Sequence, residues 1–106
     1  MILRPQLKNE SLRRVVDEWY YRNREKVEKV FGPIGSWDVS QVTDMSGLFY
    51  KKYSFNEDIR EWDVSNVKYM DSLFKDAFIF DQPIGNWNVS NVITMEGMFG
   101  AASIQF

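Results

Sequence analysis

Three tryptophans stand at a fixed interval of 25 residues, and each opens a block of nearly the same sequence. The blocks are WDVSQVTDMSGLF at 37–49, WDVSNVKYMDSLF at 62–74 and WNVSNVITMEGMF at 87–99. This period is typical of a stacked-repeat architecture, because one such unit is too small to bury its apolar side alone. The sequence therefore predicts a solenoid, which presents a surface for binding rather than an enclosed pocket.

The apolar pattern changes its period inside each repeat. Trp and Val alternate at 37–39, which predicts a short strand, and the apolar residues at 42, 45, 48 and 49 fit one face of a short helix. Gly47, Ser72 and Gly97 share one column, where small residues are expected to let these helices pack closely. The predicted fold class is an α/β solenoid of three 25-residue coils, each a strand or turn followed by a short helix.

The residues before the repeats predict two helices. The first has an apolar stripe at helical spacing, formed by Leu12, Val15, Val16, Trp19 and Tyr20. Asn9 or Ser11 is the expected N-cap of this helix. The second helix is expected over 24–30, after Asn23 as N-cap and before Gly32 and Pro33 as a stop.

The end of a repeat stack needs a cover with a polar outer face. We therefore predict that residues 1–33 form an N-terminal helical cap and that residues 34–106 form the three-repeat solenoid, with the third repeat incomplete. The length of 106 residues fits one globular unit.

The blocks WDVSxVTDMSGLF and FNEDIREWDVSNV resemble the repeats of bacterial surface lipoproteins, grouped as a mycoplasma-lipoprotein-type domain of unknown function. The resemblance covers residues 34–99 and extends to BspA-like leucine-rich repeats. It implies a leucine-rich-repeat-like solenoid, a role in adhesion or protein interaction, a location at the cell surface or outside the cell, and no catalytic residues. The first five residues carry no lipoprotein or secretory signal, so an intracellular protein or a fragment of a longer one is also expected.

Composition restricts the chemistry. The chain has no Cys and no His, which removes disulfides, thiol catalysis, Ser-His triads and His or Cys metal sites. Residues 1–33 carry eight Lys and Arg against five Asp and Glu, whereas residues 34–106 carry five against ten. An acidic repeat region argues against nucleic acid as the partner, because such affinity depends on neutralising phosphates. No apolar run is long enough to span a membrane.

Two columns offer alternatives to a purely structural role. Asp38 and Asp63, followed by Asn88, are the best pair of carboxylates for acid–base chemistry or calcium. Asp and Asn in turns usually hydrogen-bond the local backbone, and we favour that interpretation, with no catalytic residue, metal or cofactor. The tryptophan column would hold glycans if it were exposed, but a Trp that alternates with Val is expected to be core.

The predicted function is a non-enzymatic protein-interaction or adhesion module. Columns that vary between repeats are free to contact a partner, and aromatic residues dominate binding hot spots. The candidate contacts are Tyr50, Tyr53, Lys68, Tyr69, Lys75 and Phe78. The alternatives are a structural spacer or cap segment of a longer repeat array and a glycan-binding surface. Because no cap follows the third repeat, we also expect an end-to-end homodimer through it.

Overall fold

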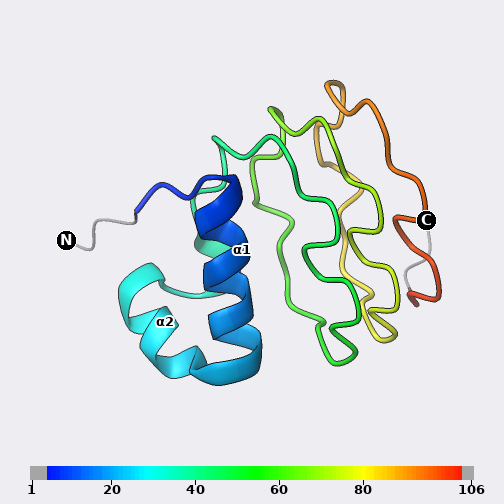
Figure 1. Cartoon of the computed structure of the whole chain (residues 1–106). Helices are drawn as coiled ribbons and strands as arrows, with labels where there is room; N and C mark the ends of the chain where they lie inside the picture. The colour runs from blue at the N-terminus through cyan, green and yellow to red at the C-terminus, as the bar shows by residue number, and fades with distance from the viewer. Residues whose placement is uncertain (1–4, 104–106) are drawn as a thin grey trace.

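The computed structural model of the chain describes residues 5–103. Its regular elements lie in the N-terminal third: helix α1 (Asn9–Asp17), a π-helical turn η1 (Glu18–Arg22), helix α2 (Arg24–Phe31) and a single 3-10 turn η2 (Ile34–Ser36). The two helices lie together at one side of the molecule (Figure 1). The three repeats lie side by side, and the third is the farthest from the helices (Figure 1).

The helices form where the sequence predicts them. The apolar stripe of α1 and η1 is buried, with Trp19 only 1% exposed. The N-cap of α1 is Lys8, whose backbone N–H donates to the Ser11 hydroxyl. The side chain of Asn23 accepts from the backbone N–H of Lys26 and caps α2, as expected. Gly32 ends α2 with a φ of 77°, a left-handed conformation that glycine adopts without strain.

The expectation of an α/β solenoid of leucine-rich-repeat type is wrong. Residues 5–103 contain no strand, and their pairing of extended type is limited to isolated bridges between single residues. The repeats also contain no α-helix, because residues 46–51 and 71–76 form turns. The chain folds as a compact globule of 36 × 27 × 22 Å, and in the described residues α1 and α2 are its two α-helices.

Left-handed residues explain why the predicted short helices do not form. Gly47 and Gly97 have a φ of 65°, and Ser72 between them has a φ of 56°. The small residues of this column therefore turn the chain, and they do not bring helices together. A second left-handed column follows four residues later, at Lys51, Asp76 and Ala101. Two such positions in each repeat break an α-helix, which needs negative φ at every residue.

Backbone hydrogen bonds hold neighbouring repeats in register. The N–H of Met45 donates to the carbonyl of Tyr69 at 2.8 Å, and the N–H of Met70 donates to the carbonyl of Thr94 at 3.0 Å. Gly47 and Ser72 repeat this pattern two residues later. Each bond joins one repeat to the next. Residues that are 25 positions apart in the sequence therefore lie beside each other in the structure.

Columns of large side chains fill the space between the repeats. The ring of Phe74 stacks on those of Phe49 and Phe99, with centroids 5.7 and 5.8 Å apart. The indole N–H of Trp62 donates to the carbonyl of Ile34, and that of Trp87 donates to the carbonyl of Ile59. All three repeat tryptophans are less than 10% exposed. The prediction that this column is core is confirmed, and a ladder of exposed indoles for glycans is wrong.

Candidate functional site, an exposed aromatic row

Four large aromatic side chains lie exposed near the junction of the helices and the repeats. We call them the aromatic row, and they are Tyr21, Tyr50, Tyr53 and Phe78. Tyr53 and Phe78 occupy the same position in successive repeats, and their rings stack with centroids 5.0 Å apart and planes 14° apart. They remain 51% and 46% exposed. A stacked pair that water still reaches presents its edges to a partner.

Tyr21 extends the row onto η1. Its side chain is 60% exposed and its ring meets that of Tyr20 edge-on, with centroids 4.7 Å apart. Partial burial raises the pKa of Tyr21, and the neighbouring Tyr20, Asp17 and Tyr53 raise this pKa further. Tyr21 therefore remains a neutral phenol, able to donate and accept hydrogen bonds.

Lysines flank the row on the repeat side. The Lys51 ammonium lies 5.2 Å from the ring centroid of Tyr50, and the side chain of Tyr50 is the main cause of a raised pKa of Lys51. Lys52 is buried and pairs with Asp17 at 2.9 Å, while its ammonium lies 5.1 Å from the ring centroid of Tyr21. An ammonium group near the face of an aromatic ring is attracted to the electrons of that ring. The row thus combines apolar edges, phenol hydroxyls and positive charge.

A buried lysine and one hydroxyl fix the helical segment against the first repeat. The hydroxyl of Tyr20 lies 2.9 Å from that of Ser54 and accepts from the Ser54 backbone N–H at 3.0 Å. The Lys52–Asp17 pair joins the same two segments. These contacts set Tyr21 beside residues more than 25 positions away in the chain, so only the folded chain assembles the row.

All six predicted contact residues are exposed. Tyr50, Tyr53 and Phe78 belong to the row. Lys75 shares a column with Tyr50, and its aliphatic part lies against Gly100. Lys68 and Tyr69 lie in other columns, where Tyr69 bridges the backbone of Asp44 and Thr94.

The sequence argument missed Tyr21 and Lys51. Tyr21 falls outside the apolar stripe of the first helix. A large aromatic residue on the polar face of a helix indicates a candidate contact residue, and this feature could have identified Tyr21. Lys51 has a positive φ, as do Asp76 and Ala101 at the equivalent positions of the next repeats. Conformational propensities do not predict a positive φ for lysine.

The Asp38, Asp63 and Asn88 column makes local turns. The hydroxyls of Ser40 and Ser65 donate to the Asp38 and Asp63 carboxylates at 2.6 Å, and these bonds lower the pKa of both carboxyl groups. The Ser90 backbone N–H donates to Asn88 in the same way. The prediction that these residues hydrogen-bond the local backbone is confirmed, because Asp38, Asp63 and Asn88 each accept from the backbone N–H two residues later. Residues 5–103 hold no group of three or more acidic side chains arranged for a metal ion.

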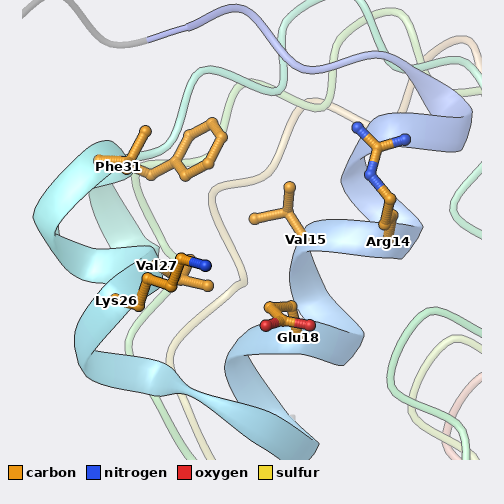
Figure 2. A pocket seen from close by; sticks show the side chains of 7 residues that line it. Arg14, Val15, Glu18, Lys26, Val27 and Phe31 are labelled. Carbon is orange, nitrogen blue, oxygen red and sulfur yellow. The ribbon is translucent and has the colours of Figure 1, made fainter.

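A pocket of about 270 Å³ lies between α1 and α2. Figure 2 shows Val15 of α1 facing Val27 and Phe31 of α2 across it, with Arg14 and Glu18 at its edge. Apolar side chains of Val15, Val27, Val30 and Phe31 form much of its lining. The pocket is the space between two packed helices. It lacks the exposed aromatic rings that make the row a better candidate for binding.

The fold and the exposed row define a small repeat protein with a surface suited to contact. Residues 15–105 match the family described as Mycoplasma protein of unknown function, DUF285. The match spans most of the chain, so the chain belongs to this family. No curated protein and no solved structure matches it. Within residues 5–103, no helix has the length and apolar character needed to cross a membrane.

Proposed function

We propose that this chain is a non-enzymatic protein-interaction module and that the aromatic row is its contact surface. The observation that carries the proposal is the stacked pair Tyr53 and Phe78, which stays about half exposed, whereas the stacked rings of Phe49, Phe74 and Phe80 are fully buried. A folded chain gains free energy by burying such rings, so their exposure favours a partner that covers them. Tyrosines next to cations are common anchors of protein interfaces.

The chemistry of the remaining surface supports a binding role over catalysis. The Asp38 and Asp63 carboxylates are held ionised by their serine partners, which makes them poor general acids near neutral pH. The chain contains neither His nor Cys as an alternative base or nucleophile. If the chain is displayed at a cell surface, this protein interaction would serve adhesion.

The test compares a double variant in the row with a single control variant outside it. Tyr53→Ala with Phe78→Ala removes the stacked pair, and Tyr69→Ala removes a somewhat less exposed tyrosine from a different column. Proteins captured from the native host by the wild-type chain are identified, purified and titrated against all three chains. We expect the double variant to lose affinity by roughly 30-fold, the effect of a hot spot of about 2 kcal/mol. Tyr69→Ala should bind as the wild type does.

Circular dichroism and urea unfolding confirm that both variants are folded before titration. If the double variant keeps full affinity for every captured partner, the row is not the contact surface. If Tyr69→Ala alone loses affinity, the contact surface includes the Tyr69 column and not the row.

A further inference from the structure

The Lys and Arg side chains of α1, η1 and α2 fall into two groups. Four of them pair with a carboxylate at distances of 3.2 to 3.8 Å, and these are Arg13 with Asp44, Arg22 with Glu18, Arg24 with Glu57 and Lys29 with Glu25. The other two, Arg14 and Lys26, make no side-chain ion pair or hydrogen bond within residues 5–103. The helical segment therefore keeps two positive charges that the described part of the chain does not compensate.

Both unpaired cations line the pocket of about 270 Å³ between α1 and α2. Figure 2 shows Arg14 on α1 and Lys26 on α2, on opposite sides of the pocket, with the Arg14 guanidinium directed away from Glu18. Glu18 is the acidic residue of this lining, and its carboxylate pairs with Arg22 at 3.8 Å. The edges of the pocket are thus positive on both helices.

The lining between these cations is apolar. Val15 and Val27 are buried, at 8% and 5% exposed, and Val30 beside them is 50% exposed. An apolar cavity of about 150 Å³ is already large enough to hold a benzene ring. The pocket therefore has room for a side chain of the size of Leu or Phe, and covering Val30 would remove further apolar surface from water.

We propose that the pocket between α1 and α2 is a docking site for an acidic amphipathic segment of a partner protein. An apolar side chain of this segment enters between Val15, Val27 and Val30, and carboxylates on either side of it pair with Arg14 and Lys26. The unpaired charges select acidic partners, because opposite potentials across an interface favour binding and like charges oppose it. Arg14 can hold a carboxylate with two parallel N–H donors.

The openness of the pocket favours a protein segment over a small apolar acid. Sites for small ligands bury most of the surface of the ligand. Here Val30 leaves one side of the pocket open to solvent. An amphipathic segment covers such a side with its own neighbouring residues, as helices do when they dock into apolar grooves. The pocket contains no residue of the aromatic row, so this site goes beyond the proposed function and does not depend on it.

The experiment begins with random peptides of about 12 residues, roughly three helical turns, displayed on phage and selected against the wild-type chain. Enriched peptides are synthesised and titrated into the labelled chain while its NMR signals are recorded. We expect the enriched sequences to place Leu, Ile or Phe between Asp or Glu residues. The methyl signals of Val15, Val27 and Val30 should shift on titration.

Two double variants with the same loss of charge then test the cations. Arg14→Gln with Lys26→Gln removes the unpaired charges, and Arg13→Gln with Lys29→Gln removes one paired cation from each of the same helices. We expect the first variant to bind the enriched peptides roughly tenfold more weakly, and the second to change affinity by less than about twofold. Added NaCl should weaken binding to the wild type more than binding to the first variant. Circular dichroism checks that both are folded.

The proposal is overturned if no enriched peptide shifts the three valine signals or if both double variants bind equally well. It is also overturned if dodecanoate or anionic phospholipid vesicles shift these signals and the peptides do not, since the occupant is then a lipid. A shift that appears in the chain alone as its concentration rises would assign the pocket to a second copy. Tyr53→Ala with Phe78→Ala should bind the peptides as the wild type does, and a loss there would place them on the row.

Discussion

At the scale of single residues, two glycines in the same column of the repeat have opposite surroundings. A Cβ on Gly35 would lie 2.3 Å from the carbonyl oxygen of Asp58, while a Cβ on Gly85 would meet nothing within 4 Å. Backbone cannot move aside as a flexible side chain does, so Gly35 is required by the close approach of the next repeat. Gly85 has no such close neighbour.

Gly35→Ala should therefore destabilise the chain by about 1–3 kcal/mol, the usual cost of overpacking. Gly85→Ala is the matched control, and it should be neutral or raise stability by up to about 1 kcal/mol through a less flexible unfolded state. The free energy of unfolding in urea measures both. Equal stability of the two variants would mean that Asp58 does not lie against Gly35.

At the scale of elements, α2 is a helix of eight residues and depends on its ends. The Asn23 side chain satisfies the N–H of Lys26 at 3.0 Å, and Gly32 closes the other end. Trp19 links this helix to η1, because its indole N–H donates to Glu28 and the Arg24 guanidinium lies 3.9 Å from its ring centroid. The helix thus positions the segment that carries Tyr21.

Asn23→Ala should cost about 0.5–2 kcal/mol, the typical loss of an N-cap. Asn23→Asp keeps an oxygen acceptor at the same place and should retain most of the stability. The measurement is urea unfolding followed by circular dichroism. If the alanine and aspartate variants lose the same stability, the cap bond does not stabilise α2.

At the scale of the whole molecule, the serine bonds to Asp38 and Asp63 make stability depend on pH. Both carboxyl groups have a pKa below their ordinary value in the folded chain. The unfolded chain, with a pKa of about 3.9 for Asp, takes up protons first as the pH falls. The stabilisation is therefore complete above the unfolded pKa and is lost as the pH falls through the lower folded pKa.

We expect the urea midpoint of the wild type to fall when the pH is lowered from 5 to 3. The double variant Asp38→Asn with Asp63→Asn should lose less over the same range, because the amide oxygen accepts the serine bonds without titrating, as Asn88 does for the Ser90 N–H. Unfolding at pH 7 first establishes that this variant is folded. A fall as large as that of the wild type would place the pH dependence in other carboxylates.

The sequence by itself determined the two helices, the core columns and the register of the repeats. Helical spacing and the Asn23 cap are local, and they need only neighbouring residues. The tryptophan column was predictable because its 25-residue period places equivalent residues side by side whatever the backbone conformation is. The turns at Asp38 and Asp63 were predictable for the same reason, because Asp side chains hydrogen-bond backbone groups only two residues away.

Tertiary structure decided the backbone of the repeats and the composition of the site. The apolar residues at 42, 45, 48 and 49 fit a helix, but bonds from each repeat to the next hold Gly47 and Lys51 at positive φ and turn the chain instead. Tyr21 lies against Lys52 of the first repeat only because Tyr20 and Asp17 bind that repeat. Side-chain periodicity reports which residues are buried, and the conformation that buries them depends on contacts between residues far apart in the sequence.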